Sequence, residues 1–211
     1  MTERVAIHCT PRELEVRLGG EAPSSSYCIP VYNLAPPGAL LVIGGKEGRR
    51  TTERVPWKHP TGQQLSVSVD ELPERLTDSG VRPVVLPVSG FYLWKTSGER
   101  AEYPFYVCPQ HEAFFLIGGV RFQSSKDHKP MGVLPIHQPA NALIQPLDVE
   151  MPWVVPNEKL DPWLRGEWVP HKGSGEAVPG LGITEMTVHR VGAPVNELDR
   201  DGKELIQPLP R

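Results

Sequence analysis

Residues 81–98 read VRPVVLPVSGFYLWKTSG, and the fold of this chain is best approached from this stretch. Its two apolar halves have the composition of two strands that meet at a corner at Ser89-Gly90. Successive side chains of a strand point to opposite faces. The second half therefore divides into Phe91, Leu93 and Lys95 on one face and Tyr92 and Trp94 on the other.

The composition around this stretch is that of a folded, turn-rich protein. The chain has 211 residues, of which 39% are apolar and 22% charged, so it is able to bury a core. Its 24 prolines and 20 glycines favour turns over long helices. The net charge of −3 gives no overall basic character, so a nucleic-acid site would have to be a local basic groove.

Location and membrane association are constrained by what the sequence lacks. Its longest apolar run, Ala39–Ile43, is far shorter than the roughly 20 residues of a membrane span. The amino-terminal residues have no apolar signal-peptide segment. The three cysteines are far apart in sequence and suit a reducing compartment. We therefore expect a cytoplasmic protein without a membrane partner.

Strand patterns outnumber helix patterns along the whole chain. Short helices are expected after Thr10, where Thr10-Pro11-Arg12-Glu13 forms a capping box, and near residues 70–76 and 157–164. Residues 21–37 are expected to be loop-rich, and residues 204–208 extended. The expected strands are 4–8, 39–43, a segment ending near 57, 65–69, 83–88, 91–95, 103–108, 113–122, 132–136, 152–155 and 183–191. This predicts one α+β domain over residues 1–211, mostly β, with a curled, barrel-like antiparallel sheet.

General catalytic and binding motifs are missing. The sequence contains no P-loop, GxSxG, HExxH or dinucleotide-binding pattern. The seven histidines are scattered, and none forms a pair with metal-ligand spacing. We therefore expect neither a metal nor a cofactor.

A series of landmarks resembles the SOS response-associated peptidase (SRAP) family, whose members process abasic sites. The landmarks occur in the family's order and span nearly the whole chain. They are YNLAPPG at 32–38, Trp57, SGFYLWK at 89–95, YPFY at 103–106, DVEMP at 148–152, and VHRV at 188–191 followed by Asn196 and ELI at 204–206.

The resemblance implies a chemistry whose functional residues are replaced here. Family members use an amino-terminal cysteine that condenses with the aldehyde of an abasic site in single-stranded DNA, assisted by an Asn, a Glu and a His. In this chain the matching positions are Thr2, Ser66, Leu93 and Asp148. Leucine transfers no proton, so acid–base assistance worth about 10²–10⁴ in rate is missing at Leu93. A threonine hydroxyl is a far poorer nucleophile than a thiolate.

Some DNA-contacting positions are retained according to the same resemblance. Arg4 matches a DNA-contacting arginine, Asn33 belongs to the YNLAPPG segment, Trp57 opens a family strand, and Arg190 lies on the closing strand. The segment 58–64 is shorter than its family counterpart, contains no Phe, Tyr or Trp, and supplies no stacking platform for bases.

Three functions remain open from the sequence. The first is a catalytically degraded family member that binds single-stranded or abasic DNA weakly. The second is an enzyme that uses Thr2, as amine or nucleophile, on abasic DNA or peptide bonds. The third is an interaction module without a nucleic-acid role.

The presence of Thr2 where the family has a cysteine thiol gives a direct prediction. Without it a thiazolidine ring cannot form, so abasic single-stranded DNA should give no heat-stable adduct unless borohydride is added. Thr2→Cys alone should restore little, because Leu93 and Asp148 still withhold proton transfer. Denaturing gels with and without reductant measure this, and a stable adduct without reductant would contradict it.

Overall fold

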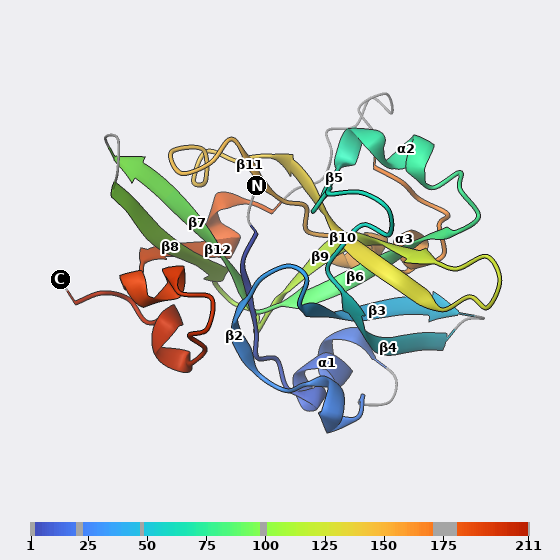
Figure 1. Ribbon diagram of the computed structural model, residues 1–211, viewed down its shortest axis with the longest axis horizontal. Helices are drawn as coiled ribbons and strands as arrows, with labels where there is room; N and C mark the ends of the chain where they lie inside the picture. The colour runs from blue at the N-terminus through green and yellow to red at the C-terminus, as the bar shows by residue number, and fades with distance from the viewer. Residues whose placement is uncertain (1–2, 20–22, 47–48, 98–100, 171–180, 211) are drawn as a thin grey trace.

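Two β-sheets and a few short helices make up the described part of the chain (Figure 1). The computed structural model describes residues 3–19, 23–46, 49–97, 101–170 and 181–210. The α-helices in these ranges are α1 (Pro11–Leu18), α2 (Leu72–Arg75) and α3 (Leu160–Leu164). The mostly-β, α+β class expected from the sequence is confirmed, and the strands are shared between two sheets instead of forming a single curled one.

Antiparallel pairing dominates both sheets. In order across the first sheet lie β12 (Met186–Arg190), β8 (Ala101–Pro109), β7 (Gly90–Ser97), β1 (Val5–Ile7) and β2 (Val31–Leu34). Across the second lie β11 (Glu150–Pro152), β10 (Pro130–Pro139), β9 (Phe115–Gln123), β6 (Val81–Val88), β3 (Ala39–Lys46) and β4 (Arg49–Pro56). The short strand β5 (Val67–Ser68) pairs with β10 and runs parallel to it.

The corner expected at Ser89-Gly90 is the point where the chain passes from the second sheet to the first. Ser89 is buried, its N–H donates to the Ala6 carbonyl at 2.9 Å, and its hydroxyl accepts from the His8 N–H at 2.9 Å. A Cβ at Gly90 would lie 2.2 Å from Cζ of Tyr106, so only glycine fits there. Strand β1 thereby fixes the corner.

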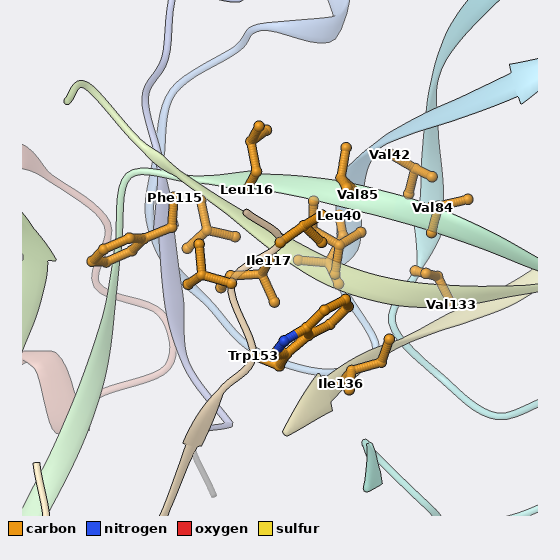
Figure 2. Close-up of a cluster of buried hydrophobic side chains, with 14 of the residues drawn as sticks. Leu40, Val42, Val84, Val85, Phe115, Leu116, Ile117, Val133, Ile136 and Trp153 are labelled. Carbon is orange, nitrogen blue, oxygen red and sulfur yellow. The ribbon is translucent and has the colours of Figure 1, made fainter. Parts of the chain in front are cut away.

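The two sheets share one apolar core. Phe91 and Leu93 of the first sheet belong to the same buried cluster as the second sheet's side chains. Figure 2 shows Trp153 in this cluster beside Ile117 and Ile136. All three of these side chains are at most 1% exposed. Burial of this apolar surface holds the two sheets together.

Helix α1 begins as its sequence predicts. The Thr10 hydroxyl accepts from the Glu13 N–H at 3.2 Å, and the Glu13 carboxylate accepts from the Thr10 N–H at 2.7 Å. Leu14 and Leu18 are its buried residues. The capping box is confirmed, because all its interactions are local in sequence.

Two of the segments that differ from the expectation do so because of long-range contacts. The loop-rich segment 21–37 contains β2, which becomes a strand by pairing with β1. Residues 203–206 form a 3₁₀ helix where an extended segment was expected. Leu205 of that helix packs on the outer face of the first sheet, in a cluster with Tyr92 and Tyr106.

Gly118 tests the packing between strand β9 and the core. A Cβ at this position would lie 2.3 Å from Cε3 of Trp153, so Gly118→Ala should lower the free energy of unfolding by about 1–3 kcal/mol. Gly119→Ala is the matched control, because its nearest neighbours, at 3.2 Å, are side-chain methyl groups of Leu86 and Val84. Urea denaturation measures both, and an equal loss in the two variants would contradict this account.

Candidate functional site

The four positions that the resemblance marks as catalytic fall in different surroundings. Thr2 lies outside the described residues. Leu93 is 1% exposed on the inner, core-facing side of β7, opposite Phe105 of β8. Ser66 and Asp148 are half-buried, and each lies next to a strand that pairs with β10. Ser66 directly precedes β5, and Asp148 lies two residues before β11 begins at Glu150.

An imidazole and a carboxylate lie close together on β10 and β11, near Asp148. His137 pairs with Pro152 of β11, and Glu150 lies diagonally across from it on the same face of the sheet. Its Nε2 is 3.3 Å from Oε1 of Glu150. On the other side of β10, His137 pairs with Ser68 of β5. The Glu150 N–H also donates to Oδ1 of Asp148 at 3.1 Å, which orients the strand start.

The surroundings of His137 favour the neutral ring. Burial lowers the pKa of His137, and the carboxylates of Glu150, Glu71 and Asp148 offset this only in part. Its Nδ1 is buried and has no hydrogen-bond partner within the described residues. A neutral ring that carries its proton on Nε2 keeps a lone pair on Nδ1, which is the less costly arrangement for a buried atom without a partner.

A second group of side chains lies on the inner side of the first sheet. Leu93, Phe105 and Arg190 form one row across β7, β8 and β12. On the same side of the sheet, Lys95 and Tyr103 form the next row along the strands, two residues further along β7. The guanidinium carbon of Arg190 lies 4.1 Å from the ring centre of Tyr103. We call Lys95, Tyr103, Phe105 and Arg190 the aromatic–basic surface; both cations are exposed and both rings are partly exposed.

Arg4 and Asn33 lie on the opposite, outer side of the same sheet. The Arg4 guanidinium donates to Oδ1 of Asn33 at 3.0 Å and stacks 5.6 Å from the Trp94 ring centre. It also donates to the carbonyl of Val195. The Asn33 amide lies within hydrogen-bonding distance of the carbonyls of Val195, Glu197 and Arg200. Both residues therefore anchor the carboxy-terminal segment to the sheet, away from the aromatic–basic surface.

Trp57 is fully buried, so its side chain exposes no surface for the DNA contact that was expected of it. Its indole N–H donates to the Leu65 carbonyl at 2.7 Å. This bond ties the end of β4 to the segment that carries Ser66. The physical reason is that a large ring bordered by β-strands gains more from burial than from exposure.

The sequence analysis assigned no functional role to His137, Glu150, Tyr103 or Phe105. For Tyr103 and Phe105 a signal was present, since they alternate along the expected strand 103–108, the next strand in the chain after 91–95. For His137 and Glu150 there was none, because their contact depends on the β10–β11 register. In the described part of the chain, no group of three His, Cys, Asp or Glu residues is placed to hold a metal ion. None of the described helices is long and apolar enough to cross a membrane.

Comparison with known proteins gives a family match and three similar structures. The family model described as SOS response associated peptidase (SRAP) matches residues 77–198, more than half of the chain. A search of curated proteins found no match.

The similar structures agree over nearly their whole length. A protein from Bacteroides thetaiotaomicron has a TM-score of 0.73 and 13% identity, covering 98% of this chain and 99% of its own. A phage-related protein from Bordetella bronchiseptica has a TM-score of 0.66 and 19% identity, covering 90% and 93%. Another protein from that organism has a TM-score of 0.65 and 11% identity, covering 91% and 100%. At these identities the likeness establishes the fold.

The burial of Leu93 predicts the effect of restoring an acid there. A carboxyl group buried at this position without a partner keeps its proton, so its folded-state pKa lies above the unfolded value of about 4.3. Below that value both states are protonated. As the pH rises, only the unfolded state ionises, so Leu93→Glu should become more destabilising, by about 2 kcal/mol or more near neutral pH.

Urea denaturation at acid and neutral pH measures this effect. Leu93→Met is the control, because it conserves volume and carries no charge; it should cost less than about 1.5 kcal/mol, equally at both pH values. If the two variants were equally stable throughout, the assigned burial of Leu93 would be wrong.

Proposed function

Because the chain belongs to the SOS response associated peptidase family, we propose that it binds single-stranded DNA, including abasic DNA, through the aromatic–basic surface. Any bond that it makes to the aldehyde of an abasic site is a reversible imine with its α-amine, not a stable ring. The observation that carries the proposal is the stacking of Arg190 on Tyr103, in the row next to Leu93.

The chemistry of these side chains suits a single strand. Single-stranded nucleic acids are bound without sequence preference by aromatic rings that stack on bases and by cations that follow the phosphates. Tyr103 and Phe105 offer the rings, and Lys95 and Arg190 offer the cations. The net charge of −3 makes such a local cluster necessary, since the chain as a whole does not attract DNA.

The catalytic part of the proposal rests on substitutions at the family positions. Leu93 is apolar and buried, so it supplies no acid or base. Asp148 replaces a histidine, and its carboxylate already accepts from the Glu150 N–H. A chain without an amino-terminal cysteine thiol, an acid at position 93 and a histidine at position 148 is expected to bind abasic DNA without forming the family's stable adduct.

Substitution of the surface tests the proposal. Arg190→Ala and Tyr103→Ala should each weaken binding of a short single-stranded oligonucleotide about tenfold, because one base stack contributes about 1–3 kcal/mol. Arg190→Ala should also reduce the salt dependence between about 50 and 200 mM, because it removes one phosphate contact. Fluorescence anisotropy measures both effects.

Arg165→Ala is the matched control for charge. Arg165 is exposed and paired with Glu167 at the end of α3, so its loss changes the net charge equally without touching the surface. Affinity should then change by less than about twofold. Wild-type affinity in both test variants would exclude this surface, and a wild-type protein that binds no single strand would point to an interaction module.

A further inference from the structure

We propose that Glu3 gives the aromatic–basic surface a preference among bases. Its carboxylate accepts a hydrogen bond from the amino group of cytosine or adenine in a single strand, and it disfavours thymine and uracil. This inference deepens the proposed function and rests on it. The observation that carries it is a row of four side chains, Glu3, Leu93, Phe105 and Arg190, which crosses the first sheet from the start of β1 to β12.

The register of β1 places Glu3 at the end of this row. Strand β1 pairs antiparallel with β7, and the Tyr92 N–H donates to the Arg4 carbonyl at 3.0 Å just before β1 begins. Continued by one residue, this register sets Glu3 opposite Leu93. Side chains opposite each other on antiparallel strands have Cβ atoms about 4.5–5.5 Å apart, so the two are direct neighbours.

Glu3 shares the inner face of the sheet with the aromatic–basic surface. Val5 belongs to the core between the two sheets, whereas Ala6 belongs to the cluster on the outer face. Arg4 also lies on the outer face, where its guanidinium stacks on Trp94. Because side chains alternate along an extended chain, Glu3 falls on the inner side, and it is exposed there.

The row has a hydrogen-bond acceptor at one end and a cation at the other. Between these exposed ends lie the buried Leu93 and the partly exposed ring of Phe105. Neighbouring strands are about 4.8 Å apart, so the Cα atoms of Glu3 and Arg190 are separated by about 14 Å. Their long side chains narrow the gap between carboxylate and guanidinium. A nucleotide presents its groups in the same order, as an amino group, a flat ring and a phosphate.

A carboxylate distinguishes bases by their exocyclic groups. When ionised it only accepts hydrogen bonds. Cytosine and adenine offer an amino group as donor, whereas thymine and uracil have a carbonyl oxygen in the corresponding place, which a carboxylate repels. In an unstacked single strand this edge of the base is free to be bound. With the ring on Phe105 and the phosphate at Arg190, the amino group is directed toward Glu3.

The charge of Glu3 has a second consequence, which makes the inference easier to test. A negative charge beside a site for phosphates lowers the affinity for every strand. Removing it should therefore abolish the preference and, at the same time, tighten the binding of thymine strands. A variant that merely fails to fold would bind all strands more weakly, so the two explanations give opposite results.

The experiment compares ligands that differ at one edge of the base. Short single strands of 5-methylcytosine and of thymine differ only in the amino or carbonyl group at C4 and in the proton on the adjacent ring nitrogen. Anisotropy measures their affinities at mildly alkaline pH and constant salt, and NMR titration measures those of the two nucleoside 5′-monophosphates. The proteins are wild type, Glu3→Gln, Glu3→Ala and Arg190→Ala. Glu158→Gln is the control, because Glu158 is an exposed acid of the 3₁₀ helix Asn157–Lys159.

We expect wild type to prefer the 5-methylcytosine strand at least about fivefold, the lower limit for a good base contact. Both Glu3 variants should reduce this preference to less than about twofold and bind the thymine strand more tightly than wild type does. Arg190→Ala should weaken both strands alike and keep the preference. Glu158→Gln should match wild type.

Equal affinity of wild type for the two strands, or an unchanged preference in both Glu3 variants, would overturn the inference. The monophosphates separate it from the proposed function. If no strand binds, but wild type selects the 5-methylcytosine monophosphate and Glu3→Gln does not, the proposed function fails and the base selection stands. If neither strands nor monophosphates bind, both are wrong.

Discussion

The arrangement of the two sheets depends on the hydrogen-bonded corner at Ser89-Gly90. Ser89 is buried between them, where its N–H and hydroxyl both bond to the backbone of the amino-terminal strand, at Ala6 and His8. A buried polar backbone must be paired, so this corner is stable only with β1 in place. The corner allows one continuous stretch of chain to contribute β6 to one sheet and β7 to the other. It thereby sets the position of Leu93 on β7, and of the side chains on β8 and β12, which pair in turn beside β7.

The two faces of the first sheet have different surroundings. Its outer face is covered by the carboxy-terminal segment, which Arg4 and Asn33 hold through backbone carbonyls. Its inner face passes from the buried core at Leu93 to the aromatic–basic surface at Tyr103 and Arg190. Because side chains alternate along a strand, neighbouring positions in sequence serve opposite faces. This is why Arg4, expected to contact DNA, lies on the other side of the sheet from Arg190.

A leucine at position 93 suits the buried core around it. A buried carboxyl without a partner costs stability, whereas leucine gains from burial. His137 and Glu150 lie on the other sheet, at the β10–β11 edge, where the Glu150 side chain is 40% exposed and that of His137 15% exposed.

The sequence by itself determined what depends on near neighbours: the strands around 81–98 with their corner, the capping box of α1, the mostly-β class and the family. These follow from period-two patterns, turn residues and local hydrogen bonds. Only the tertiary structure decided that Trp57 is buried, that β2 exists, and that His137 meets Glu150 and Arg190 meets Tyr103. Each of these depends on which strands pair and in which register, and residues far apart in sequence carry no local signal of that pairing.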